Sequence, residues 1–594
     1  MLKKFFLHIL SSFVGTMIAI GLCGAALVFL VIGLIGRFGL NSELPSVKGY
    51  SVLMIDLSGT ISESERSAEI DLQDLIMTQE LGKSQALNVL VKAIDEASVN
   101  KNIKAIYLKC DGVSAAPATL STLRSSLIEF KKSGKRVFAY GDSMTQGDYF
   151  VATTADSLFL NPAGSVAIQG LGSNTMFFKG LFDKIGVKFT AIKVGTYKSA
   201  VEPYIQETMS GPARAQLDTL FNTMWKEVCG SMAAARGITP ERIDSLIDRD
   251  YIFLGEGEEA KNAKLVDALV YEYEMKKKIA SYVGEKNADN VKYVTPQMLV
   301  GTIDFGATSG TQVAVLYAEG EIQETSDGGI NCHKLVPVII RLAEDDNVKA
   351  LVLRVNSPGG SVFGSKQIAE ALNYFKSKGK PFAVSMGDYA ASGGYWISAD
   401  ADRIFANALT ITGSIGIFGL IPDASGLISK LGIGMEMVST SPDAQFPNLL
   451  RSLTLSQTEA LQKMIDKGYD QFVKRVANGR KMSEEKVRKI AEGRVWSGIA
   501  AKELGLVDEI GSLQDAVKWA AKKANLGDNY GIGLYPETKS SVWDILSATG
   551  AIEATSRFEQ IEAVGVPLPA MRKAWMMLQR KPEQALMIPL KIYI

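Results

Sequence analysis

Short apolar segments alternate with amphipathic ones along most of this 594-residue chain. The apolar segments have the length of strands and are rich in Val, Ile, Leu and Ala, as in the segment Pro381-Phe-Ala-Val-Ser385. Between them, apolar residues recur at helical spacing, as in residues 366–375 and 455–465, which predicts helices that bury one face. Alternation of strands and helices is typical of parallel sheets covered by helices, so the pattern predicts an α/β fold.

A longer apolar run precedes this pattern. It extends from Phe5 to Ile35, with Lys3 and Lys4 before it. Since about 20 apolar residues span a bilayer, we expect a short cytoplasmic N-terminus and a transmembrane helix within residues 1–44. A cleaved signal peptide, the less favoured alternative, would have a shorter apolar region. The lysines favour a cytoplasmic N-terminus, which places the rest of the chain outside the cytoplasm.

The rest of the chain contains one series of motifs twice. The matching segments are 51–61 and 312–322, 103–112 and 348–360, 136–142 and 381–388, 155–160 and 401–406, 164–170 and 413–419, and 263–267 and 504–508. Their common order indicates a tandem duplication. We expect an N-terminal repeat at 45–300, a C-terminal repeat at 311–535, a linker within 291–312 and a helical extension at 536–594.

Composition argues against several classes of function. Lys and Arg total 64, as do Asp and Glu, so the formal net charge of +0 gives no electrostatic reason to expect nucleic acid as a partner. The four cysteines show no CxxC spacing, so no metal site or disulfide framework is predicted, and we expect no cofactor. The two histidines are His8, in the apolar run, and His333, in an expected loop, so a serine nucleophile would need another base.

Ser392 is a candidate nucleophile. It lies among small residues in the segment Gly387-Asp-Tyr-Ala-Ala-Ser-Gly-Gly-Tyr-Trp396, at the expected junction of a strand and a helix. Backbone N–H groups that open a helix favour a developing oxyanion, and small neighbours let a substrate approach. The same glycines also suit a tight turn without a chemical role, so the serine alone does not decide the function.

The two repeats differ where chemistry is expected. Aligning Gly387 with Gly141 places Ser392 opposite Gln146, so the N-terminal repeat lacks the serine. Conversely, the N-terminal repeat has Lys198 in a region where the C-terminal repeat has no lysine. One repeat therefore has a candidate nucleophile and the other a candidate base, as a site shared between two halves would require. A solvated surface lysine is the alternative.

Four motifs resemble those of a known peptidase family. They are Tyr197-Lys-Ser-Ala-Val-Glu-Pro-Tyr204, Val355-Asn-Ser-Pro-Gly-Gly-Ser361, Gly387-Asp-Tyr-Ala-Ala-Ser-Gly-Gly-Tyr395 and Ile411-Thr-Gly-Ser-Ile-Gly-Ile-Phe-Gly419. With these motifs in this order, the chain resembles the family of signal peptide peptidase A, or protease IV, in its long, duplicated, membrane-anchored form. The resemblance covers nearly the whole chain. The resemblance implies a Clp-protease/crotonase-like fold in each repeat. It also implies a homotetrameric serine endopeptidase on the outer face of the bacterial inner membrane, which degrades residual signal peptides.

The resemblance also implies the roles of individual residues. It makes Ser392 the nucleophile, Lys198 the general base and Ser414 a hydroxyl that orients the base. A lysine base needs its pKa lowered from about 10.4 to about 7–8, a shift worth about 3–5 kcal/mol that burial can supply. The backbone N–H groups of Gly393 and Gly360 would then bind the oxyanion, although a simple turn is the alternative for the second glycine.

Two other functions compete with the peptidase. A crotonase-like acyl-CoA enzyme would direct the same N–H groups at a thioester, but an exported domain has no access to cytoplasmic CoA. A catalytically inactive membrane-anchored scaffold would need neither Ser392 nor Lys198. For the peptidase, the expected partners are hydrophobic peptides, the lipid bilayer and further copies of this chain.

Overall fold

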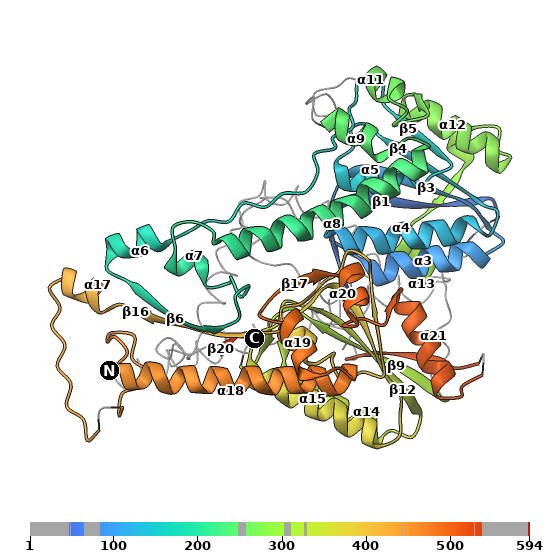
Figure 1. Cartoon of the computed structure of the whole chain (residues 1–594). Coiled ribbons are helices and arrows are strands. Elements are labelled where there is room, and N and C mark those ends of the chain that lie inside the picture. The colour runs from blue at the N-terminus through green and yellow to red at the C-terminus, as the bar shows by residue number, and fades with distance from the viewer. Residues whose placement is uncertain are drawn as a thin grey trace, which may run out of the picture. The chain divides into compact units, whose positions relative to one another are not determined.

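The computed structural model describes residues 47, 49–64, 84–247, 257–301, 310–325, 329–441, 443–527, 529–536 and 592–593. Two sheets, one from each half of the chain, form the centre of this part of the protein (Figure 1). The anchor that the sequence predicts within residues 1–44 lies outside the described residues. Among the helices that are described, none is both long enough and apolar enough to cross a membrane.

The first sheet is parallel, and its strands follow the order β2-β1-β3-β4-β5-β7, with β8 beside β1. Helices cover both faces, and for this reason the central strands are apolar on both sides. The strands are β1 (Ser51–Ser62), β2 (Ser84–Ala86), β3 (Ile103–Ser114), β4 (Arg136–Gly141), β5 (Ser157–Leu160), β7 (Ala268–Leu269) and β8 (Lys292–Val294). The helices of this half are α3 (Leu87–Val99), α4 (Pro117–Lys131), α5 (Gln146–Ala152), α6 (Lys179–Ile185), α7 (Glu202–Ile205), α8 (Gly211–Arg236), α9 (Pro240–Ile247), α11 (Gly257–Asn262), α12 (Glu272–Val283), the 3-10 turn η1 (Ala288–Asn290) and α13 (Pro296–Gly301).

The second sheet follows the order β17-β15-β13-β12-β9-β19, with β14 beside β13 and β18 beside β14. All its pairings are parallel except that of β15 with β17. The strands are β9 (Gln312–Glu319), β12 (Val348–Ser357), β13 (Phe382–Ala391), β14 (Arg403–Ala406), β15 (Ile411–Gly413), β17 (Val495–Ser497), β18 (Glu509–Ile510) and β19 (Gly531–Tyr535), and a separate pair consists of β10 (Ile322–Gln323) and β11 (Ile330–Asn331). The helices are α14 (Cys332–Glu344), α15 (Val362–Ser377), α16 (Gly393–Trp396), α17 (Ser425–Lys430), α18 (Leu455–Arg480), α19 (Glu484–Ile490), α20 (Gly498–Leu504) and α21 (Leu513–Lys523).

Equivalent hydrogen bonds in the two halves confirm the predicted duplication. In each half an aspartate accepts a hydrogen bond from a strand N–H, and a buried tyrosine donates its hydroxyl to the carbonyl two residues before that aspartate. The pairs are Asp267 with Leu158 and Asp508 with Ile404, and Tyr149 with Leu265 and Tyr395 with Leu506. The two halves therefore share detailed packing as well as strand order.

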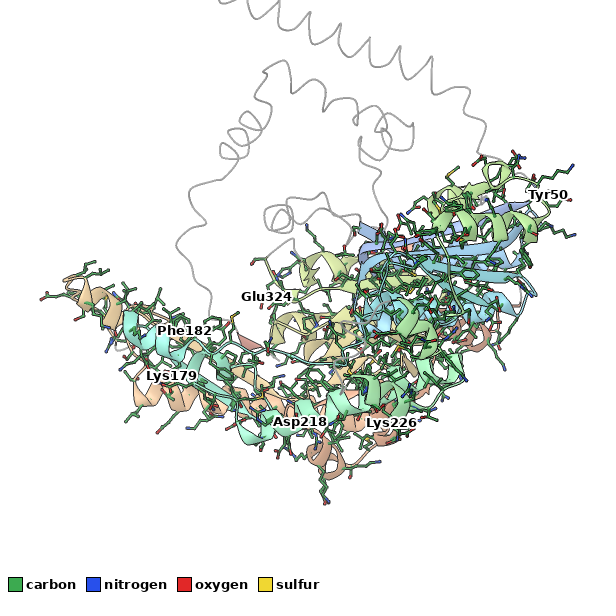
Figure 2. All side chains as sticks on the ribbon, turned by 90° about the horizontal axis from the view of Figure 1, so that it is seen from above. Tyr50, Lys179, Phe182, Asp218, Lys226 and Glu324 are labelled. Carbon is green, nitrogen blue, oxygen red and sulfur yellow. The ribbon has the colours of Figure 1, made fainter. Side chains whose placement is uncertain are left out.

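A third, smaller sheet joins the halves. Strand β6 (Lys188–Val194) of the first half pairs antiparallel with β16 (Ile417–Asp423) of the second over their whole lengths, and α18 packs against both (Figure 1). Figure 2 shows Lys179 and Phe182 of α6 at one end of this region, while α8 leads from it toward the first sheet. The antiparallel register sets the residues that follow β6 beside those that precede β16.

The far edge of β16 pairs with β20 (Ile592–Tyr593). These two residues belong to the segment 536–594, which the sequence predicts to be helical. They form a strand instead, because the exposed edge of β16 offers backbone partners. Apart from Pro536, the rest of that segment lies outside the described residues.

The predicted linker at 291–312 is wrong over its first part, and residues 302–309 lie outside the described residues. Strand β8 lies beside β1, and α13 packs against α3, so residues 292–301 belong to the first half. Pro296, which suggested a linker, is the first residue of α13, a position where its missing N–H costs no hydrogen bond.

His333 also differs from its predicted place. It lies in the first turn of α14 instead of a loop, because the Asn331 side chain accepts the N–H groups of His333 and Lys334 and caps the helix.

Candidate active site

Ser392 lies at the sharp junction between β13 and α16. Its backbone adopts φ 56° and ψ −119°, a conformation that a non-glycine residue adopts only when its surroundings hold it. Its N–H donates to the Gly413 carbonyl at 2.8 Å, and only 2% of the residue is exposed. The predicted strand-to-helix junction is thus present, although α16 is only one turn long.

Lys198 follows β6 in a turn and reaches the same point from the first half of the chain. Its Nζ atom lies 2.9 Å from Ser392 Oγ, 2.9 Å from Ser414 Oγ and 3.0 Å from the Ser414 carbonyl oxygen. The lysine is 3% exposed. The structure therefore brings together three residues that the sequence singled out, and Lys198 is not the solvated surface lysine of the alternative interpretation.

Burial lowers the pKa of Lys198 to about 7. The three oxygen atoms around Nζ are neutral hydroxyl and carbonyl groups, so no negative charge there offsets the desolvation of an ammonium ion. A lysine with a pKa lowered this far is unprotonated in a substantial fraction of molecules near neutral pH, which is the state that a general base requires.

The turn Glu492–Gly493 supports the lysine and was not predicted from the sequence. A Cβ atom at Gly493 would lie 2.6 Å from the Cβ of Lys198, and the Glu492 carbonyl accepts the N–H of Tyr197 at 2.9 Å. Gly493 has φ 76°, which favours glycine. Its sequence signal is the glycine in Ala491-Glu-Gly493, which alone does not indicate contact with a residue 295 positions away.

Ser414 also holds the lysine. It has φ 51°, and its N–H donates to the Arg494 carbonyl at 2.7 Å. Both its hydroxyl and its carbonyl oxygen then reach Lys198 Nζ. This geometry is compatible with the orienting role that the resemblance implies.

Gly393 and Gly360, the expected oxyanion donors, both lie close to Ser392 along the chain or in space: Gly393 follows it directly, and Gly360 belongs to the turn that approaches it. Gly393 opens α16, so its N–H has no acceptor within the helix. The turn at Gly360 is held to Ile322 by the Gly359 carbonyl and the Ser361 N–H, and the Gly360 N–H takes part in neither bond. Both groups thus have the donor character that an oxyanion hole requires.

Gly359 is a residue of the site that was not predicted. A Cβ atom there would lie 2.7 Å from the Cβ of Ser392 and 2.8 Å from the Gly393 nitrogen. With φ 108°, Gly359 also has a backbone conformation that side chains rarely permit. The close approach of this turn to the serine therefore explains Gly359, whereas Gly360 is required by another contact, since a Cβ atom there would lie 2.2 Å from the Ile322 carbonyl oxygen.

A cavity of about 410 Å³ borders the segments that form the site. Ser361, which follows Gly360, and Ile417, three residues after Ser414, both line it. Its apolar lining consists of Val362, Phe363, Ile417, Met464, Ile465 and Gly468, with Glu324, Lys366, Lys467 and Gln471 as polar neighbours. The cavity has the size and lining to accept an apolar side chain.

A second cavity, of about 950 Å³, has a different character. It is lined mainly by charged side chains, and several of these already form ion pairs, such as Arg475 with Asp400. Like the first cavity, it is lined by neither Ser392 nor Lys198. No group of side chains suited to hold a metal ion occurs among the residues that the structure describes.

Comparison with known proteins gives consistent matches. The family model described as Peptidase family S49 matches residues 129–285 and 374–527, and the one described as Clp protease matches residues 308–410. Protease 4 of Salmonella typhi is 36% identical over 90% of this chain and 87% of its own length. The chloroplastic serine protease SPPA of Arabidopsis thaliana is 27% identical over 85% of this chain and 74% of its own length. A putative signal peptide peptidase SppA of Enterococcus faecium is 31% identical over 47% of this chain and 86% of its own length.

Proposed function

This chain belongs to peptidase family S49, and we propose that it is a membrane-anchored serine endopeptidase whose Ser-Lys dyad is divided between two repeats. One observation carries the proposal. Lys198 Nζ, from the first half of the chain, lies 2.9 Å from Ser392 Oγ, from the second, and both residues are buried. A nucleophile within reach of an unprotonated base is the arrangement that covalent hydrolysis needs.

In the proposed mechanism, neutral Lys198 takes the proton of Ser392 Oγ as that oxygen attacks the peptide carbonyl. The carbonyl oxygen becomes an oxyanion, which the N–H groups of Gly393 and Gly360 stabilise. The lysine then gives its proton to the departing amine, and the C–N bond breaks to leave an acyl-enzyme. A water molecule then attacks the acyl-enzyme while Lys198 accepts its proton. The lysine returns this proton to Ser392 Oγ as the ester bond breaks and the carboxylic acid product is released.

The orientation of the lysine depends on Ser414 in this mechanism. A primary amine rotates freely about its last bond, and an oxygen on each side restricts that rotation. The Ser414 hydroxyl at 2.9 Å and carbonyl at 3.0 Å supply two such contacts, and Ser392 supplies the third. The nitrogen lone pair can therefore point at the serine proton for much of the time.

We assign hydrophobic peptides as substrates, in particular signal peptides left in the membrane after their release. The apolar cavity beside Ser361 and Ile417 supports an apolar residue near the scissile bond. The similarity to the putative signal peptide peptidase SppA of Enterococcus faecium supports signal peptides as the substrate class. The apolar run from Phe5 to Ile35 would place the enzyme where such peptides remain.

The proposal also includes an organisation of the chain in the cell. Residues 1–44 would anchor it in the bacterial inner membrane, with the repeats at 45–300 and 311–535 on the outer face. The family resemblance supports assembly as a homotetramer. The segment 536–594 follows the repeats, and we assign it no catalytic residue.

A fluorophosphonate probe tests the proposal, because it labels only an activated serine. We expect one adduct, on Ser392, and hydrolysis of a hydrophobic peptide by the wild-type chain. The Ser392→Ala variant should neither form the adduct nor hydrolyse the peptide. Ser398→Ala is the matched control, since Ser398 is also buried and its hydroxyl only donates to the Gly394 carbonyl. Wild-type turnover by Ser392→Ala would disprove the nucleophile, and an unlabelled wild-type protein would favour the scaffold.

A further inference from the structure

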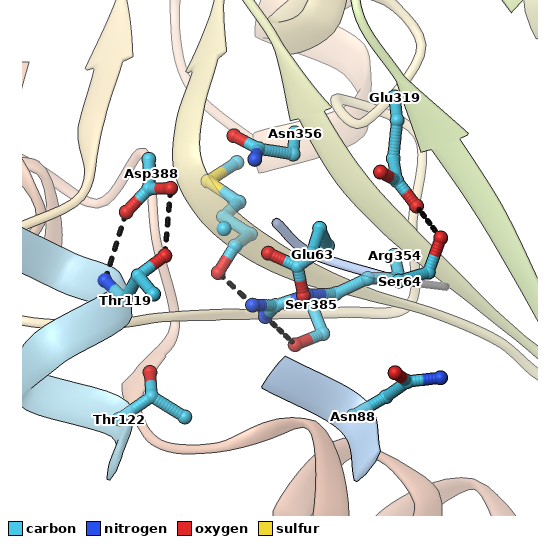
Figure 3. Close-up of polar contacts among 12 residues, drawn as sticks. Glu63, Ser64, Asn88, Thr119, Thr122, Glu319, Arg354, Asn356, Ser385 and Asp388 are labelled. Atoms are coloured by element: carbon cyan, nitrogen blue, oxygen red, sulfur yellow. Dashed lines mark hydrogen bonds and ion pairs between the residues drawn. The ribbon is translucent and has the colours of Figure 1, made fainter. Parts of the chain in front are cut away.

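A buried ion pair crosses from the first half of the chain to the second. Arg354 lies on β12, and its Nε donates to Oε1 of Glu63 at 2.6 Å, just after β1 ends (Figure 3). Arg354 is 5% exposed and Glu63 6% exposed. A charge pair so deeply buried needs its hydrogen bonds, because loss of one partner leaves the other charge without compensation.

The same arginine also binds the strand that carries the nucleophile. Its Nη1 donates to the Ser385 hydroxyl and to the Met386 carbonyl, each at 2.9 Å (Figure 3). Both residues lie on β13, which ends at Ala391, directly before Ser392. Arg354 therefore connects Glu63 of the first half directly to the backbone that leads to the serine.

Strand β13 needs such support at this point because it changes neighbour there. Residues 383–385 pair with β14, whereas residues 389–391 pair with β15. On its other edge, the ladder with β12 contains a bulge, where Asn356 lies opposite residues 387–389. A bulge re-aims the strand beyond it and leaves backbone groups outside the ladder.

Side chains take over the hydrogen bonds that the ladder does not supply. The Gly387 carbonyl accepts the Thr410 hydroxyl, and the Tyr389 N–H donates to the Asn356 side chain. Asp388 accepts both the N–H and the hydroxyl of Thr119, at 2.8 Å each, from the first turn of α4 (Figure 3). A second contact from the first half thus reaches residues 387–389, the bend that the bulge makes in β13.

Gly387 makes room for the carboxylate that completes this arrangement. A Cβ atom at Gly387 would lie 3.0 Å from Oε2 of Glu63, closer than ordinary van der Waals contact. That oxygen is buried and has no hydrogen-bond partner among the residues that the structure describes. The carboxylate is therefore held against the bend by Arg354, and a conservative change at Glu63 acts directly on this contact.

The equivalent position in the first half has no such pair. Arg354 corresponds to Lys109, which lies opposite Tyr140 as Arg354 lies opposite Ser385. The Lys109 side chain is 36% exposed and pairs with Asp111 at 3.5 Å. The buried arginine thus occurs in the half that has the serine.

From these contacts we propose that Arg354 and Glu63 are positioning residues for Ser392. Through them the first half, which supplies Lys198, also holds the bend of β13 that presents the serine to that lysine. This inference rests on the proposed function. Neither residue touches the reacting atoms, so their effect is on the distance and alignment between Ser392 Oγ and Lys198 Nζ.

Glu63→Gln tests this role because it keeps the size of the side chain and removes the charge. We expect kcat and the rate of fluorophosphonate labelling to fall by about 10- to 100-fold, with KM little changed. Hydrogen exchange in a peptide that spans residues 386–392 should become faster. Arg354→Lys keeps the buried positive charge opposite Glu63, so it serves if Glu63→Gln does not fold, and it should show a smaller loss of the same kind.

Asp508→Asn is the matched control. Asp508 pairs with Arg480, whose side chain is 6% exposed, but both residues belong to the second half. This variant should lower the melting temperature while kcat and exchange at 386–392 stay near wild type. The positioning role is overturned if folded Glu63→Gln matches wild type in kcat and exchange, or if Asp508→Asn loses as much kcat. Failure of the wild-type chain to label would overturn the proposed function itself.

Discussion

At the scale of single residues, the site depends on two serines with strained backbones. Ser392 and Ser414 have φ of 56° and 51°, and each is held by an N–H bond to a carbonyl of a different segment. Such conformations cost free energy and persist only where the surroundings determine them. The strain directs both hydroxyl groups toward one amine, so the local geometry agrees with the proposed dyad.

The lowered pKa of Lys198 predicts a rise of activity with pH. Below about pH 7 the amine is protonated and cannot accept the serine proton, so kcat/KM should fall about tenfold per pH unit there and level off above. Initial rates on a hydrophobic peptide from about pH 5.5 to about pH 9 measure this. Lys198→Ala should be inactive throughout, whereas Lys179→Ala, which changes an exposed lysine, should keep the wild-type profile. A flat profile for the wild-type enzyme would mean that lysine is not the base.

At the scale of elements, helix α18 contains an interior glycine that helix propensity disfavours. Gly468 lies in a helix of 26 residues, where glycine costs about 1 kcal/mol relative to alanine. It lines the apolar cavity, and a Cβ atom there would lie 2.8 Å from Cδ1 of Ile417. The glycine therefore leaves room beside Ile417 in the cavity, whereas a residue that favours the helix more would fill this room with its side chain.

Filling this space predicts a change in substrate preference. Gly468→Leu should lower kcat/KM about tenfold or more for peptides with a large apolar residue in this cavity, and less for peptides with alanine there. A panel of peptides that differ at one position measures the preference. Gly230→Ala in α8 is the control, since its Cβ meets nothing within 4 Å; it should leave the preference unchanged and stabilise the fold by about 0.5–1 kcal/mol. An unchanged preference in Gly468→Leu would show that substrate does not enter the cavity.

At the scale of the described part of the chain, the two halves are joined where the dyad forms. The pairing of β6 with β16 brings Lys198 to Ser414, while Glu63 and Thr119 reach the bend before Ser392. The halves share the equivalent hydrogen bonds of Asp267 and Asp508 and of Tyr149 and Tyr395 but differ at these contacts. The duplication thus supplies two halves of similar fold, and the residues of the site lie at positions where the halves differ.

A dyad within one chain predicts that two inactive variants do not restore each other. Mixed full-length Ser392→Ala and Lys198→Ala chains should stay as inactive as either alone, even when co-expressed, because Nζ and Oγ of one chain lie 2.9 Å apart. Peptide hydrolysis by the co-purified mixture measures this, with wild type diluted into Ser392→Ala as the positive control. Recovered activity would place the lysine and serine of one site on different chains.

Much of the candidate site could be predicted from the sequence, because the duplication provides an internal comparison. The loss of serine at Gln146 and the presence of Lys198 pointed to complementary halves without any structure. Strand and helix alternation predicted the α/β fold for a similar reason, since periodicity reflects which faces are buried. Two predictions were wrong, the first part of the linker and the loop at His333. Pro296 and Asn331 stand at the starts of helices in this chain, but these residue types occur equally well in loops.

Sequence by itself therefore determined the fold class, the repeats and the chemical type of the candidate residues, all of which follow from local pattern. Only the tertiary structure decided how those residues meet. The 2.9 Å between Lys198 and Ser392, the burial that lowers the lysine pKa, the support from Gly359 and Gly493 and the ion pair between Glu63 and Arg354 all join segments far apart in the chain. Such contacts depend on strand register and packing, and these are properties of the folded molecule that no short stretch of sequence contains.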